Sequence, residues 1–248
     1  MGKPPKAVEV YLKKTRTYFF GLLAILPLLI LYESASEYLN RQSPDAIEAT
    51  TEVRNRAELL IKRVLWFAQI EKNVYLWAVF AAVLLWAFWV AKQQGHLDFK
   101  LVYFPYQIFE SLVYALVFGF AISKLTAFLN LQANGAPQNL LSRKMTLALG
   151  AGIYEELLFR FLLLTALAFV FRKLFKIKPL YYNSLAVLLS AAVFSYYHYW
   201  SNAEVLTTDS FLFRFYAGGI LGALYVLRGI GVSAYTHTFY DLLLLFRG

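Results

Sequence analysis

Three ionisable residues lie close together inside one of the most apolar stretches of this 248-residue chain. The stretch, residues 145–171, is long enough to cross a lipid bilayer, and its middle reads GIYEELLFR, with Glu155, Glu156 and Arg160. An ionised side chain near the centre of a bilayer is costly unless it faces a partner or a cavity. Glu156 and Arg160 are four residues apart and can pair on one helical face, whereas Glu155 points about 100° away from that partner.

Two later apolar stretches carry histidines at the same four-residue spacing. Phe194 and His198 share a helical face in FSYYHY, and His237 and Asp241 share one in HTFYD. Either histidine alone would be read as a hydrogen-bond partner between membrane helices. Together with the glutamates and the arginine they supply a general base, a group that orients it and an electrophile. Their joint occurrence on three successive apolar stretches therefore favours a catalytic cluster.

Apolar stretches also predict the helices that must hold this cluster. Hydrophobic residues make up 60% of the chain and the mean hydropathy is +0.53, while charged residues make up only 16%. An α-helix needs about 20 apolar residues to cross a bilayer. Such stretches lie near residues 18–32, 74–91, 106–129, 145–171, 180–200, 211–227 and 230–246. We therefore expect a polytopic, all-α membrane bundle of about seven transmembrane helices (six to eight), forming a single domain over residues 1–248.

The charges of the chain predict its partners and its orientation. The net charge is +9, but the basic residues flank apolar stretches, so we expect anionic membrane lipids as partners and no nucleic acid. Lysine and arginine are concentrated at the N-terminus and at loops on the same side, which places the N-terminus in the cytoplasm. The compact chain with short loops favours a prokaryotic cell membrane. The oligomeric state is left open by the sequence.

A further helix is expected between the first two spans. Apolar residues recur at helical spacing over residues 52–70, opposite a basic face. Such a helix either lies in the membrane interface or packs on the bundle as an ordinary connection. Two small-residue pairs, at Gly150 with Gly152 and at Gly218 with Gly222, predict close approach of neighbouring helices.

The motifs resemble those of one known family. They are EExxxR at Glu155, Glu156 and Arg160, FxxxH at Phe194 and His198, and HxxxD at His237 and Asp241. In this order they resemble the CAAX-protease and bacteriocin-processing family of Rce1-like intramembrane glutamic endopeptidases. The resemblance covers residues 145–246 as a catalytic core and leaves residues 17–143 as N-terminal spans. The family usually ends the third motif in asparagine, so Asp241 is a departure from it.

The resemblance implies an endopeptidase that uses no metal ion or other cofactor. Glu155 would be the general base that activates water, His198 would assist it, and His237 with Asp241 would stabilise the oxyanion. Glu156, Arg160 and Phe194 would give structural support. The substrate would be a membrane-associated peptide or a C-terminal tail.

An ionised Asp241 cannot donate a hydrogen bond to an oxyanion. Either it stays protonated, or it accepts the proton of His237 and fixes the orientation of that ring. The second role is favoured.

Four alternatives remain beside this interpretation. Glu155, His198, His237 and Asp241 could ligate zinc in a membrane metallopeptidase, although the chain has no HExxH motif. Ser195 could be a nucleophile, three residues before His198, or could simply bond back to its own helix. The cluster could also serve a non-catalytic peptide-binding or immunity-type membrane protein, or a proton-coupled transporter.

Overall fold

Helices account for the regular secondary structure of the described residues. The computed structural model describes residues 7–41, 53–67, 74–93, 100–128, 141–200 and 205–246. Within these ranges the helices are α1 (Ala7–Thr15), α2 (Tyr18–Arg41), α3 (Arg56–Phe67), α4 (Val74–Gln93), α5 (Tyr103–Phe128), α6 (Leu141–Gly150), η2 (Ala151–Leu164), α7 (Thr165–Phe175), α8 (Pro179–Tyr197), α9 (Thr208–Arg228) and α10 (Ile230–Leu245). Each of the seven apolar stretches overlaps one helix or one continuous helical run, with residue 129 outside the described ranges. The all-α prediction is therefore confirmed for the described residues.

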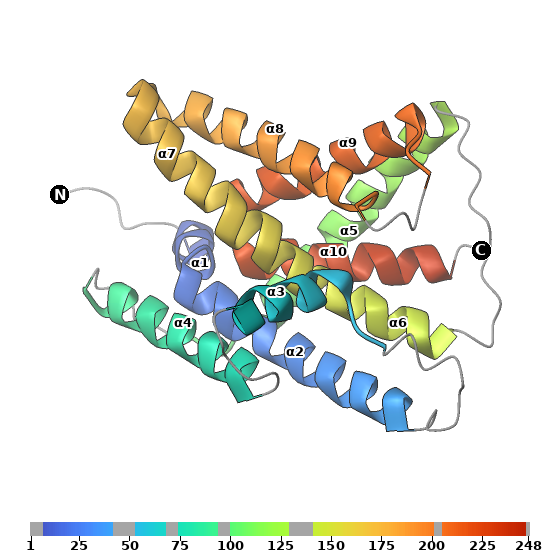
Figure 1. The fold of residues 1–248 in the computed structure, drawn as a ribbon. Helices are drawn as coiled ribbons and strands as arrows, with labels where there is room; N and C mark the ends of the chain where they lie inside the picture. Colours follow the sequence, from blue (N-terminus) through green and yellow to red (C-terminus); the bar gives the residue numbers. More distant parts are fainter. Residues whose placement is uncertain are drawn as a thin grey trace.

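The long helices run back and forth between the side of the molecule marked N and the side marked C (Figure 1). In the described part of the chain, three segments are long and apolar enough to cross a membrane, namely Tyr18–Arg41, Tyr103–Leu125 and Thr208–Arg228. Residues Phe80–Gln93 of α4 add a shorter apolar helix. The protein is thus a multi-pass, all-α membrane bundle.

Helix α10 lies at the centre of the bundle. It packs against α5, η2, α2, α9 and α6, and residues 230–238 are all buried. Close packing depends on glycine, because a Cβ atom added to Gly152 would lie 1.9 Å from Thr238 Oγ1 and 2.8 Å from the carbonyl oxygen of Ala234. The backbone of η2 therefore lies directly against α10, as the small residues predicted.

The stretch expected as one span, residues 145–171, lies in a continuous helical run from α6 through η2 to α7. The run ends at Lys176, whose φ of 49° and ψ of 30° are left-handed, and Pro179 then begins α8. Its middle segment, η2, is π-helical and holds Glu155, Glu156 and Arg160. π-Helical geometry is rare and is frequently found at functional sites.

Candidate active site

Glu156 is the most heavily bonded carboxylate of the site. Its side chain is fully buried, with 0% exposed, and its Oε1 lies 3.0 Å from Arg160 Nη1 and 2.8 Å from His237 Nδ1. Ser233 Oγ donates a hydrogen bond to the other oxygen, Oε2. The predicted pair between Glu156 and Arg160 is therefore present, and it is joined by two donors from α10. A buried carboxylate with this many charged and polar partners is held in one place.

The ring of His237 is oriented by Glu156. An ionised carboxylate can only accept hydrogen bonds, so His237 Nδ1 carries the proton in the 2.8 Å contact with Glu156. His237 Nε2 lies 3.6 Å from Asp241 Oδ2, which is beyond hydrogen-bond distance. From the sequence we favoured Asp241 as the residue that fixes the orientation of the His237 ring, but in the structure Glu156 makes that hydrogen bond. Asp241, 27% exposed, instead lies near the nitrogen that faces away from Glu156.

Phe194 connects the three motifs. The guanidinium carbon of Arg160 lies 4.5 Å from the centroid of its ring, a cation–π contact. The rings of His198 and His237 approach edge to face, with centroids 4.9 Å and 6.5 Å from that of Phe194. A Cβ atom on Gly218 would lie 2.9 Å from Phe194 Cδ1, so this glycine of α9 makes room for the ring. The phenylalanine of FxxxH thus contacts Arg160 and lies beside both histidine rings.

His198 follows the last residue of α8. Its Nδ1 lies 2.9 Å from the carbonyl oxygen of Phe194, so Nδ1 carries a proton in that contact and Nε2 is the nitrogen suited to accept one. Ser195, one turn earlier, is fully buried and donates its hydroxyl proton to the carbonyl oxygen of Phe211 at 2.7 Å. This bond reaches the neighbouring helix α9 and not the helix of Ser195 itself. Ser195 therefore links α8 to α9.

Glu155 has surroundings unlike those of Glu156. It is buried, and its Oε1 accepts a hydrogen bond of 3.3 Å from Asn55 Nδ2. It lies close enough to Tyr197, His237 and Asp241 for electrostatic interaction. Asn55 comes 100 residues earlier in the chain, just before α3, and sequence reasoning did not select it. Asn55 fell inside the helix expected over residues 52–70, whereas α3 begins at Arg56, so the signal that could have found it is the preference of asparagine for helix caps.

The side chains of the described residues do not form a metal-binding group near this cluster. Within the described ranges, no group of three or more histidine, cysteine, aspartate or glutamate side chains is arranged to hold a metal ion. A cavity of about 770 Å³ lies between α1, α2, α4, α7 and α9, and none of the predicted site residues lines it. The candidate site is accordingly the polar cluster on η2, α8 and α10.

Comparison with known proteins agrees with the motif analysis. Residues 137–243 match the family described as type II CAAX prenyl endopeptidase, Rce1-like, and this range contains every predicted site residue. No curated protein and no solved structure matches the chain. This part of the chain, residues 137–243, is thus similar to the Rce1-like type II CAAX prenyl endopeptidases.

Proposed function

We propose that the protein is an intramembrane endopeptidase that hydrolyses a peptide bond by means of a water molecule activated at Glu155. The observation that carries this proposal is the contrast between two neighbouring carboxylates in the segment that matches a peptidase family. Glu156 bonds to Arg160, His237 and Ser233, whereas among the described residues Glu155 accepts one hydrogen bond, from the amide of Asn55. Glu156 therefore suits a structural role, whereas the carboxylate oxygens of Glu155 can accept a proton from water.

In the proposed reaction, Glu155 accepts a proton from water while the water oxygen bonds to the carbonyl carbon of the substrate. The carbon–nitrogen bond of the resulting tetrahedral intermediate then breaks, and the proton passes from Glu155 to the leaving amine. General-base assistance of this kind typically contributes about 100- to 10,000-fold to a rate. His198, at the end of α8, would assist the proton transfer through its Nε2.

Charge develops on the carbonyl oxygen during this reaction and needs a hydrogen-bond donor. His237 can be that donor in its imidazolium form, because Glu156 holds Nδ1–H and Nε2–H then remains for the oxyanion. Donors fixed in place before the reaction act strongly in a site that excludes water. Asp241, 3.6 Å from Nε2, would favour the charged ring without taking its hydrogen bond.

The substrate in this proposal is a membrane-associated peptide or a C-terminal protein tail. The support is the description of the matched family as prenyl endopeptidases together with the location of the site among membrane helices. Prenylated CAAX peptides and their unmodified counterparts are the natural first probes. Surrounding membrane lipids would hold both enzyme and substrate.

The test compares membrane-peptide pools by mass spectrometry in cells that produce the wild-type protein, Glu155→Gln or Glu37→Gln. Glu37 pairs with Arg41 on the exposed end of α2 and is the matched control. We expect at least one peptide or protein tail to accumulate uncut with Glu155→Gln and to be cut with the other two. Identical pools in all three strains would contradict the proposal.

A further inference from the structure

We infer that Asn55 is a positioning residue for Glu155, and that the segment formed by residues 53–67 is a cover that holds this amide against the carboxylate. The inference rests on the proposed function, since it assigns Asn55 a part in the same reaction. Residues 53–67 lie outside the range that matches the family, residues 137–243. The contribution would therefore come from the N-terminal part of the chain.

Both ends of the Asn55 amide have a defined partner. Oδ1 accepts a hydrogen bond of 2.8 Å from the backbone N–H of Ala57, which caps the start of α3. Nδ2 donates to Glu155 Oε1 at 3.3 Å. Rotating the amide by 180° would place an oxygen against the carboxylate and an NH₂ group against an N–H donor. The cap therefore fixes which end of the amide faces Glu155.

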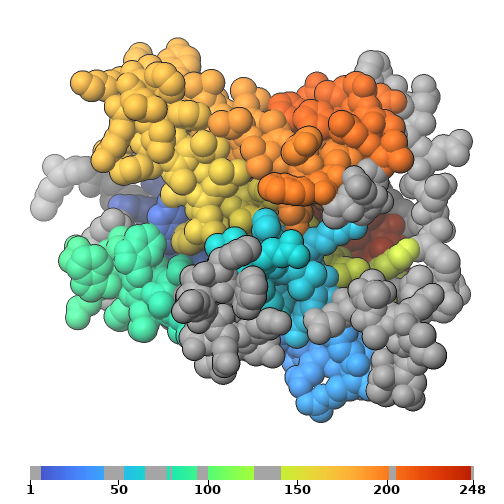
Figure 2. Space-filling view, viewed as in Figure 1, coloured from blue at the N-terminus to red at the C-terminus, as the bar shows by residue number. Residues whose placement is uncertain are grey.

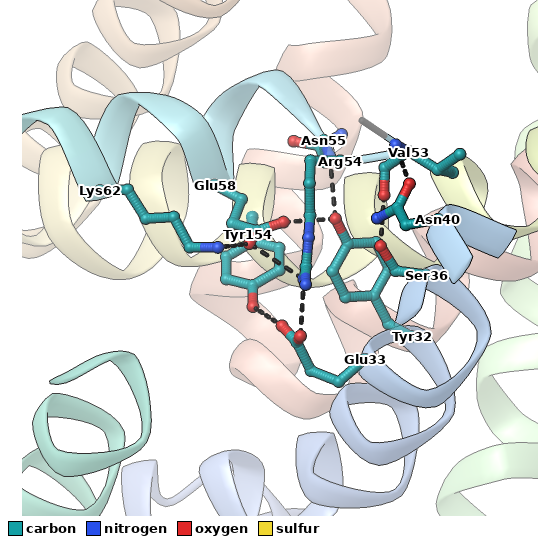
Figure 3. Close-up of polar contacts among 10 residues, drawn as sticks. All are labelled: Tyr32, Glu33, Ser36, Asn40, Val53, Arg54, Asn55, Glu58, Lys62 and Tyr154. Atoms are coloured by element: carbon teal, nitrogen blue, oxygen red, sulfur yellow. Dashed lines mark hydrogen bonds and ion pairs between the residues drawn. The ribbon is translucent and has the colours of Figure 1, made fainter. Parts of the chain in front are cut away.

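The backbone of Asn55 is anchored to α2. Its N–H donates to Tyr32 Oη at 2.8 Å, and the Tyr32 hydroxyl in turn donates to the carboxylate of Glu58 (Figure 3). Just before Asn55, Val53 N–H donates to Asn40 Oδ1 at 2.8 Å. The chain before and after the Asn55 side chain is thus bonded to the C-terminal half of α2.

A cluster of charged residues around the buried Glu58 holds the same segment in place. Arg54 Nη1 lies 2.6 Å from Glu33 and 3.2 Å from Glu58, and Lys62 Nζ lies 2.5 Å from Glu58 (Figure 3). Burial alone would lower the pKa of Arg54, but its hydrogen bond to Glu33 and the charge of Glu58 raise that pKa above its ordinary value. The arginine stays charged and keeps the first turn of α3 on α2.

The cluster also reaches the residue before the proposed base. Tyr154 Oη donates to Glu33 Oε1 at 2.9 Å, from η2 to α2. One turn earlier, a Cβ atom on Gly150 would lie 2.8 Å from Asn55 Cβ and 2.6 Å from Tyr32 Cε2. Only a residue without a side chain allows Asn55 this approach to η2. Contacts at Gly150 and Tyr154, both just before Glu155 in the chain, therefore fix the distance between the cover and the carboxylate.

The surface view agrees with a covering role for the segment. Residues 53–64, in cyan, occupy part of the front face, between the yellow-to-orange surface of the C-terminal helices and the blue end of α2 (Figure 2). Asn55 itself is buried beneath this surface. With Oε1 held by Asn55, Oε2 is the oxygen of Glu155 left to take the proton from water. The amide would thereby select one oxygen and one direction for proton transfer.

Asn55→Ser is the variant that isolates this contact. Serine and asparagine are both good helix caps, so α3 keeps its cap, but the short hydroxyl cannot reach Glu155. Asn183→Ser on α8, beside the cavity of about 770 Å³, is the matched control. Gly150→Ala is an independent variant, because its methyl group would displace Asn55 and Tyr32.

Two measurements on protein reconstituted in lipid nanodiscs test the inference. The first is steady-state cleavage of a peptide that wild-type protein cuts. We expect kcat to fall roughly 10- to 100-fold in Asn55→Ser, as for the loss of a hydrogen bond to a charged group, with KM changed less than about threefold. The second is labelling of Glu155 by dicyclohexylcarbodiimide, followed by mass spectrometry. We expect faster labelling in Asn55→Ser and Gly150→Ala and no change in Asn183→Ser.

The two measurements separate failure of this inference from failure of the proposed function. Loss of cleavage in Glu155→Gln with unchanged kcat in Asn55→Ser overturns the positioning role, whatever the labelling shows, and leaves the proposed function standing. Wild-type cleavage by Glu155→Gln overturns the proposed function and the positioning role with it. Lower kcat and faster labelling in both Asn55→Ser and Gly150→Ala support the inference.

Discussion

Replacing Arg160 with methionine removes one half of a buried ion pair and leaves the other half, Glu156, inside the bundle. Arg160 is 1% exposed and Glu156 is 0% exposed. Removing one partner of such a pair costs about 3–5 kcal/mol. Glu156 would keep His237 and Ser233 as donors, so we place the cost of Arg160→Met near the lower end, at about 3 kcal/mol.

The reverse change, Glu156→Gln, should cost more. It leaves the guanidinium of Arg160 with the carbonyl oxygen of Gly218, at 3.4 Å, and the ring of Phe194. We place this cost near the upper end, at about 5 kcal/mol. The double variant Glu156→Gln/Arg160→Met leaves neither charge unpaired. It should therefore cost about 2–3 kcal/mol less than the sum of the single changes.

Reversible unfolding in bicelles by sodium dodecyl sulfate, followed by tryptophan fluorescence, measures these three free energies of unfolding. The matched control is the pair Glu37 and Arg41, which has the same four-residue spacing but side chains 61% and 77% exposed. For Glu37→Gln, Arg41→Met and the double variant, the cost of the double change should differ from the sum of the single changes by about 0.5 kcal/mol or less. The reasoning would be refuted if the cost of Glu156→Gln/Arg160→Met equalled the sum of the two single costs within about 0.5 kcal/mol.

Three further predictions follow from the site. Asp241→Asn should retain activity within about tenfold of wild type, because the oxyanion donor, His237, keeps its contact with Glu156, and an asparagine amide could add a second donor. A loss as large as that of Glu155→Gln in the same cleavage assay would contradict this. Treatment with a chelator should leave cleavage by purified protein unchanged, whereas loss on chelation and recovery with zinc would favour the metallopeptidase alternative. Gly152→Ala should lower the free energy of unfolding by about 1–3 kcal/mol, because its Cβ would lie 1.9 Å from Thr238 Oγ1. An unfolding midpoint equal to that of the wild type would contradict the close packing of η2 on α10.

The sequence predicts the helices well because their apolar lengths are a local property. It predicts their ends less well. The first apolar stretch was expected over residues 18–32, but α2 continues to Arg41. The polar continuation bonds to the segment before α3, through Glu33 with Arg54 and Ser36 with Val53, and such contacts cannot be read from composition.

The helix expected over residues 52–70 is observed as Arg56–Phe67, with residues 52 and 68–70 outside the described ranges. It was expected either in the membrane interface or on the bundle. Ala57 and Glu58 are fully buried and α3 packs on η2, whereas Val64 on the same helix is exposed. The start of α3 is thus a packed connection, fixed by the buried Glu58 and its ion pair with the partly exposed Arg54.

In the site, too, contacts within one helix were predicted from the sequence, whereas contacts between distant segments were not. The pair of Glu156 and Arg160 was predicted because a four-residue spacing on one helix brings side chains together. The contact of Glu156 with His237 spans 81 residues, and that of Glu155 with Asn55 spans 100. Neither has a signature in the spacing, so the sequence pointed to Asp241 as the partner of His237.

The most direct test of the central claim is the turnover of Glu155→Gln in lipid nanodiscs, on a peptide that the wild-type protein cleaves. If Glu155 activates the water, kcat should fall by about 100- to 10,000-fold while the unfolding midpoint stays at the wild-type value. Glu37→Gln, measured beside it, should match wild type in both quantities. A Glu155→Gln protein that cleaves the peptide within about threefold of the wild-type rate would contradict the account, since the general base it assigns would then be unnecessary.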